Sequence, residues 1–192
     1  MTRRSVHAAL ALSILMATAG CATLPPPGVA PPPAPLGAFE LTGRVGVRYQ
    51  EQGFNGGVRW THQGGRDEVW LTTPLGQAVA RVNAIPGEVT LVTSDRKIWR
   101  AADASALTRE ALGWELPLDG LRYWVAGFSR PGREATTRRG EAGRLERLTQ
   151  DGWKIEYTEY TVAGGHALPR TLIAARDGVE IRLTVDSWSL SP

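Results

Sequence analysis

A two-residue alternation of apolar and polar side chains runs through most of the chain after residue 38, and it restricts this part to β-strands with one buried face. Successive side chains of a strand point to opposite faces, so the spacing of Phe39, Leu41, Val45 and Val47 places them together. Nine such runs predict short strands over residues 39–50, 58–61, 68–73, 77–83, 88–93, 97–101, 143–150, 153–161 and 179–185.

Two Asp-Gly pairs, at residues 151–152 and 177–178, lie between alternating runs. This dipeptide favours the two-residue turn of an antiparallel hairpin, since both residues tolerate a positive φ. Each pair therefore predicts that the strands on its two sides are antiparallel neighbours in the sheet.

The two-residue alternation of apolar and polar side chains ends after residue 101, and the apolar residues that follow have helical spacing. This change predicts a helical insertion in mid-chain. Asp103 can cap a short helix over residues 104–113. Pro117 can start a second helix with an apolar stripe through Leu121 and Trp124, which Gly127 ends. We therefore expect a mainly β domain that closes as a barrel or a strongly curved sheet.

The first 20 residues have the features of a secretory signal. Arg3 and Arg4 precede an apolar run over residues 8–19, which is too short to span a bilayer. The small residues before Cys21 resemble a bacterial lipobox, although Thr18 stands where leucine is usual. We expect Cys21 to be lipidated and to become the new N-terminus; the alternative is an ordinary signal with an incidental cysteine. A single cysteine also excludes an intramolecular disulfide.

The residues after the signal predict a tether. Seven of the 13 prolines lie within residues 22–37, so residues 21–37 form a lipidated cysteine and a stiff spacer of about 45 Å. Residues 38–192 form the folded domain. Removing residues 1–20 lowers the formal net charge from +3 to +1, so the composition gives no support for nucleic-acid binding.

Catalytic motifs are absent from the sequence, which has no nucleophile elbow, phosphate loop or paired metal-ligand spacing. The histidines beyond the signal, His62 and His166, are expected in loops, and Asp119 and Asp186 are expected to be structural. We therefore predict that the protein is not an enzyme and needs no metal or cofactor.

Four arginines, Arg138, Arg139, Arg144 and Arg147, lie close together with two acids between them. This run is typical of a solvated hairpin. The alternative is a docking surface for an acidic partner or for lipid headgroups.

The turn over residues 71–77 places a leucine at its tip, because Pro74 and Gly76 flank Leu75. A single exposed leucine usually needs no explanation. In a membrane-tethered protein, however, Leu75 could enter the acyl boundary, where its burial contributes about 1.5–3 kcal/mol.

Several segments together resemble a known family. They are Leu-Thr-Thr-Pro-Leu-Gly at 71–76, Asn-Ala-Ile-Pro-Gly at 83–87, residues 117–127, Trp-Lys-Ile-Glu-Tyr at 153–157, and Ile-Arg-Leu at 181–183 with Trp188. With Cys21, this order resembles the outer-membrane lipoprotein receptor LolB family of Gram-negative bacteria. The resemblance implies an open, eleven-stranded antiparallel barrel with a helical lid over a hydrophobic cavity. It also implies that Leu75 protrudes and serves membrane insertion.

The resemblance implies a monomeric receptor that is anchored in the outer membrane and faces the periplasm. It would accept lipoproteins from the carrier LolA and release them into the inner leaflet. Exposing one acyl chain of roughly 14 methylenes to water costs about 11 kcal/mol, so cargo must pass between apolar cavities. We expect inward-facing residues such as Val47, Trp60, Leu91, Leu121 and Trp124 to bind the chains. The alternatives are a soluble LolA-type carrier and a structural envelope lipoprotein with a filled barrel.

Overall fold

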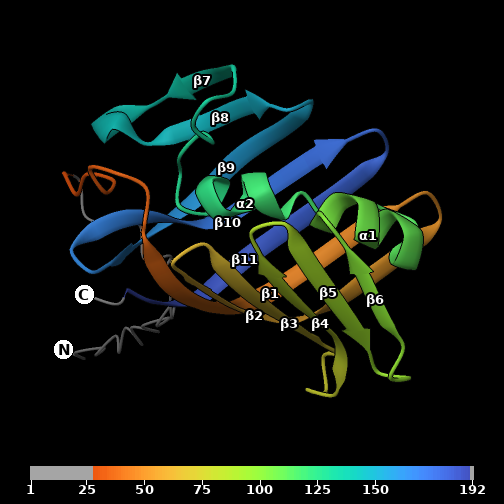
Figure 1. The fold of residues 1–192 in the computed structure, drawn as a ribbon. Helices are drawn as coiled ribbons and strands as arrows, with labels where there is room; N and C mark the ends of the chain where they lie inside the picture. Colours follow the sequence, from red (N-terminus) through yellow and green to blue (C-terminus); the bar gives the residue numbers. More distant parts are fainter. Residues whose placement is uncertain (1–27, 191–192) are drawn as a thin grey trace, which may run out of the picture.

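One antiparallel sheet of eleven strands forms most of the computed structural model, which describes residues 28–190 (Figure 1). The strands are β1 (Ala38–Tyr49), β2 (Gln52–Gln63), β3 (Arg66–Thr72), β4 (Ala78–Ile85), β5 (Glu88–Thr93), β6 (Ile98–Ala101), β7 (Ala135–Arg139), β8 (Leu145–Gln150), β9 (Trp153–Ala163), β10 (His166–Arg176) and β11 (Val179–Ser189). The helices are α1 (Ala104–Leu112) and α2 (Leu118–Trp124), and a single 3₁₀ turn, η1 (Glu141–Gly143), precedes β8.

The sheet is open. Its order is β6-β5-β4-β3-β2-β1-β11-β10-β9-β8-β7, so β6 and β7 are its two edges and they do not pair with each other. The chain crosses from one edge to the other through α1 and α2, which lie over the inner side of the curved sheet (Figure 1). The expected open antiparallel barrel of eleven strands with a helical insertion is confirmed.

The core lies between the inner face of the sheet and the two helices. In the final strand, β11, the predicted apolar set is buried, and Val47 of β1 stands opposite Ile181. Both Asp-Gly pairs form hairpin turns as predicted: φ is 51° and 49° at Asp151 and Asp177, and the following glycines are also positive. Asp103 caps α1 by accepting from the Ala106 backbone N–H.

Two strands fall outside the predicted runs, and several are longer than their runs, β2 most of all. β7 is exposed along its whole length, so it carries no alternation, and β10 has consecutive buried residues such as Ala167 and Leu168. β2 begins at Gln52 rather than at residue 58, because its glycines allow an unusually close approach. A Cβ at Gly56 would lie 1.9 Å from the backbone oxygen of Thr72.

Part of the proline-rich segment packs on the barrel. The carbonyl of Ala30 accepts a hydrogen bond of 2.9 Å from the Ala167 backbone N–H, and Pro32 is buried. The length of spacer that stands free of the domain is therefore shorter than the whole of residues 22–37. The predicted signal and Cys21 lie outside the described residues. Within residues 28–190, neither helix has the length and apolar character needed to cross a bilayer.

Candidate functional site: an apolar cavity and an exposed loop

A narrow cavity of about 50 Å³ lies between the sheet and the α2 region. The strands β1, β2, β3 and β11 supply one wall, and the α1–α2 connection and α2 supply the other. Every lining side chain is apolar: Val45, Val47, Phe54, Val58, Trp60, Val69, Leu71, Trp114, Leu116, Leu118, Leu121, Ile181 and Leu183. The site is therefore suited to hydrocarbon and not to a polar ligand.

The five residues predicted to contact acyl chains are all buried, but they do not lie together. Val47, Trp60 and Leu121 line the cavity. Leu91 is buried in the core and stands opposite Trp99 of β6, away from the cavity.

Trp124 is the fifth of these residues, and it fixes the end of α2 instead of lining the cavity. Its indole Nε1–H donates to Gln150 Oε1 at 2.9 Å, and its carbonyl accepts from the Tyr157 hydroxyl at 2.9 Å. Its ring also packs against Trp153, with centroids 6.3 Å apart. Burial raises the pKa of Tyr157 well above its ordinary value, so this hydroxyl stays a donor.

A buried carboxylate at the cavity's edge was not foreseen from the sequence. Asp67 of β3 is completely buried, and its Oδ1 accepts from Trp60 Nε1 at 2.9 Å and lies 2.7 Å from His62 Nδ1. Arg122 of α2 reaches Asp67 Oδ2 at 3.4 Å. The expectation of a loop position for His62 is wrong, because His62 lies within β2 and faces this carboxylate. The signal was present: Asp67 shares the inward phase of Val69.

Arg122 therefore joins α2 to the inner face of the sheet. It also pairs with Asp119 one turn earlier, at 2.6 Å, so Asp119 is structural as expected. The α1–α2 connection is held as well, because Glu115 pairs with Arg109 of α1 and with Arg176 of β10. These ion pairs and the Trp124 contacts hold the lid closed over the cavity.

The loop between β3 and β4 presents Leu75 to solvent. The loop is closed by hydrogen bonds from the Thr73 N–H to Gln77 O at 2.8 Å and from the Gly76 N–H to Thr73 O at 2.9 Å. Gly76 has a φ of 82°, which favours glycine. The Leu75 side chain is 89% exposed.

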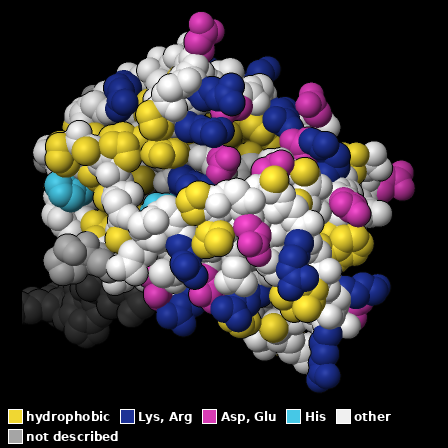
Figure 2. Space-filling view, in the orientation of Figure 1, with side chains coloured by type: hydrophobic (Ala, Val, Ile, Leu, Met, Phe, Trp, Pro, Cys, Tyr) yellow, Lys and Arg dark blue, Asp and Glu magenta, His cyan; other side chains and the backbone are white. Residues whose placement is uncertain are grey.

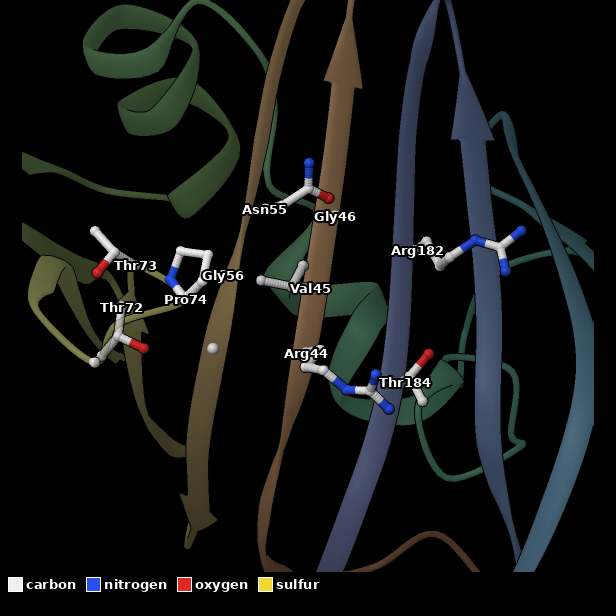
Figure 3. Close-up of a pocket in the computed structure, with 12 residues that line it drawn as sticks. Arg44, Val45, Gly46, Asn55, Gly56, Thr72, Thr73, Pro74, Arg182 and Thr184 are labelled. Atoms are coloured by element: carbon white, nitrogen blue, oxygen red, sulfur yellow. The ribbon is translucent and has the colours of Figure 1, made fainter.

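A larger hollow of about 500 Å³ lies beside this loop, and its lining mixes arginine, asparagine and threonine side chains with glycines, Val45 and Pro74. Figure 3 shows Thr72, Thr73 and Pro74 on one side of it, and Arg44, Arg182 and Thr184 across from them. Arg44 is engaged by Asp186 at 3.0 Å, which gives Asp186 the structural role expected of it. Because charged and polar side chains are part of its lining, this hollow suits an acyl chain less well than the wholly apolar cavity.

The four clustered arginines make contacts within the β7–β8 hairpin and with the neighbouring strand β9. Arg138 pairs with Glu146 at 2.7 Å, and Arg147 approaches Glu156 at 3.3 Å. Arg139 donates to the Gly143 carbonyl, and the Arg144 guanidinium lies over the Tyr160 ring. Their positions agree with the solvated-hairpin interpretation. Within residues 28–190, no three His, Cys, Asp or Glu side chains are grouped as a metal site.

Comparison with known proteins gives a consistent result. Residues 37–188 match the family model of the outer membrane lipoprotein LolB. The chain is 45% identical to the outer-membrane lipoprotein LolB of Thiobacillus denitrificans over 185 residues, which cover 96% of this chain and 98% of the relative. It is 44% identical to that of Nitrosomonas europaea over 152 residues, covering 78% of this chain and 72% of the relative.

A solved structure shares the fold at low identity. It is a Vibrio parahaemolyticus domain assigned to outer-membrane lipoprotein sorting, with a TM-score of 0.51 and 8% identity. The match covers 81% of this chain and 86% of that one. At this identity the similarity concerns the arrangement of the strands and helices alone.

Proposed function

Since the chain belongs to the LolB family of outer-membrane lipoproteins, we propose that it accepts lipoproteins from a LolA-type periplasmic carrier and inserts them into the outer membrane. The observation that carries this proposal is the wholly apolar lining of the cavity between the sheet and α2. A cavity with no polar lining group selects hydrocarbon. The acyl chains of lipoproteins are hydrocarbon of this kind.

Uptake of a chain requires the cavity to enlarge. An apolar cavity of roughly 150 Å³ is needed to bind a molecule as small as benzene, and this cavity measures about 50 Å³. The α2 lid is therefore the element that must move, because it is held by side-chain contacts and by no strand pairing. Burial of the chain in the widened cavity keeps each methylene out of water, which is worth about 0.8 kcal/mol per methylene.

Insertion would use Leu75. A leucine at the tip of a hydrogen-bonded loop can enter the acyl boundary without reorganising the domain, and its burial contributes about 1.5–3 kcal/mol. That energy orients the molecule at the membrane but does not anchor it. The anchor would be acylated Cys21, with the domain on the periplasmic side and acting as a monomer.

The test is transfer of a radiolabelled lipoprotein from its carrier to the purified lipidated protein, and then into liposomes. Leu75→Glu should accept cargo at the normal rate and deliver it at least tenfold more slowly, because the carboxylate resists burial. Ile85→Glu is the matched control, since Ile85 is also exposed but lies at the other end of β4. Normal delivery by Leu75→Glu would refute the role of this residue. Failure of the unsubstituted protein to accept cargo from the carrier would refute the whole proposal.

The narrowness of the cavity favours one alternative, a structural envelope lipoprotein with a filled barrel. Titration with a fluorescent fatty acid distinguishes the two. Saturable binding with one site supports the receptor, and absence of binding supports the filled barrel. Intact mass of the membrane-extracted protein separates both from a soluble carrier, which would have an unmodified Cys21.

A further inference from the structure

A second turn lies beside the Leu75 loop and shares its character. The described large apolar side chains that are exposed are Leu75, Ile98, Val162 and Ile85, and Ile98 ranks second at 55%. Ile98 begins β6, directly after the β5–β6 turn at residues 94–97. The two most exposed apolar side chains therefore lie in or directly after two turns, β3–β4 and β5–β6, at the same end of the sheet (Figure 1).

Hydrogen bonds join this turn to the strand that leaves the Leu75 loop. The Ser94 N–H donates to the carbonyl of Val79 at 2.9 Å, and Ala80 stands opposite Thr93. Since β4 starts one residue after Gln77, the two turns are neighbours. Ile98 pairs with Val92, and the adjacent pair contains the buried Leu91 on the core side, so Ile98 points outward.

The β5–β6 turn carries a positive charge at this tip. The Thr93 hydroxyl donates to Asp95, and Lys97 lies 2.9 Å from it; these contacts lower the pKa of Asp95 to about 2. The charges of Asp95 and Lys97 therefore cancel at physiological pH. Arg96 is exposed, has a left-handed φ of 64°, and makes no ion pair within residues 28–190. Figure 2 shows basic and apolar side chains side by side on the lower part of the molecule.

The turn is also internally fixed. The Arg96 N–H donates to Thr93 O at 2.9 Å, and the Thr93 N–H donates to Lys97 O at 3.1 Å. Ile98 and Leu75 are therefore presented by two hydrogen-bonded turns, and little conformational entropy is lost when both meet a surface.

We infer that the Leu75 loop and the β5–β6 turn form one membrane-contact surface, in which Leu75 and Ile98 enter the acyl boundary of an anionic phospholipid bilayer and Arg96 pairs with the net negative charge of an anionic headgroup. This inference rests on the proposed function and deepens it. Leu75 alone fixes one point of contact with the membrane, whereas Leu75, Ile98 and Arg96 together fix the orientation of the domain on the membrane. Apolar side chains beside a basic one match the interface of such a bilayer.

Depth measurement with single-cysteine variants tests the surface. Cys21 is the only cysteine of the sequence, and acylation blocks its thiol. A cysteine introduced at position 75, 98 or 85 is therefore the only thiol that reacts with a nitrobenzoxadiazole probe. Intact mass shows whether one probe has been attached. Lipidated Leu75→Cys, Ile98→Cys and Ile85→Cys are reconstituted in vesicles of phosphatidylethanolamine and phosphatidylglycerol. We expect blue-shifted emission and quenching by headgroup-proximal spin-labelled lipid at 75 and 98, and aqueous emission at 85.

The outcomes separate the two proposals. Insertion of the probe at position 75 but not at position 98 overturns this inference and leaves the proposed function intact. Insertion at neither position overturns the inference and also the insertion step of the proposed function. Insertion at all three positions also overturns the inference, because the contact would then not be confined to this tip.

Arg96→Gln tests the charge. In vesicles containing phosphatidylglycerol, the ratio of inserted to exposed probe at position 98 should fall about fivefold. It should stay unchanged where phosphatidylcholine replaces phosphatidylglycerol. Arg100→Gln, an exposed arginine further along β6, is the matched control. An unchanged ratio for Arg96→Gln in anionic vesicles would remove Arg96 from the contact, as would equal effects of the two substitutions.

Discussion

At the scale of single residues, Asp67 is the position where the sheet and the lid depend on one another. Its carboxylate is buried beside an apolar cavity, and such a charge is tolerated only when it is paired and hydrogen-bonded. Trp60, His62 and Arg122 surround it, and Arg122 belongs to the opposite layer. One side chain therefore organises the polar edge of an otherwise hydrocarbon site.

Asp67→Asn is expected to lower the free energy of unfolding by about 3 kcal/mol, because it removes the buried charge that faces the partly buried Arg122 while keeping the side-chain volume. Urea unfolding followed by tryptophan fluorescence measures it. Asp177→Asn is the control: this side chain is exposed in an Asp-Gly turn, where asparagine is equally suited, so the change should stay within about 0.5 kcal/mol. Equal effects of the two substitutions would contradict this role of Asp67.

At the scale of elements, α2 is a short helix held by side chains that come from distant strands. Tyr157 of β9 donates to the last carbonyl of the helix, that of Trp124, and Gln150 of β8 accepts from its indole. A seven-residue helix is not stable alone, so these contacts set its place.

Tyr157→Phe is expected to weaken the protein by about 1 kcal/mol at neutral pH, because the hydrogen bond to Trp124 is lost. The difference should shrink at alkaline pH. Burial raises the pKa of Tyr157 in the folded protein above its ordinary value of 10.0, so the unfolded chain ionises first. The stability that Tyr157 contributes is complete below pH 10.0 and is lost progressively as pH rises above that value, whereas phenylalanine has no proton to lose. Urea unfolding from about pH 8 to 11 measures both curves, and parallel curves would show that Tyr157 contributes nothing to alkaline unfolding.

The elements also show what the sequence could predict. The inward phase of β1 and β11, both hairpin turns and both helices follow from local periodicity and turn chemistry. β7 does not, because a strand that is exposed on both faces has no alternation. The candidate site was predicted in part: alternation distinguishes inside from outside but not one part of the core from another. Leu91 and Trp124 are inside, yet only the packing of α2 shows that the cavity lies elsewhere.

At the scale of the whole molecule, the open sheet accounts for how an interior with only a narrow cavity could admit a ligand. A closed barrel has a fixed circumference, whereas β6 and β7 are separate edges joined only through the helical segment. Movement of α2 can therefore widen the interior without breaking a strand pair. If the interior opens in this way, the small cavity beneath α2 is where we expect the opening to begin.

Val58→Leu tests this idea, because Val58 lines the cavity and one methylene can enter its roughly 50 Å³. Filling the cavity should raise the free energy of unfolding by about 0.8 kcal/mol and should weaken the binding of a fluorescent fatty acid at least fivefold. Val89→Leu is the control: Val89 is equally buried but does not line the cavity, so the added methylene should cost about 1–3 kcal/mol by overpacking and leave the affinity unchanged. A stabilised Val58→Leu protein that binds the fatty acid normally would place the acyl chain elsewhere in the molecule. Weaker binding with increased stability would show that the cavity beneath α2 is where the chain enters.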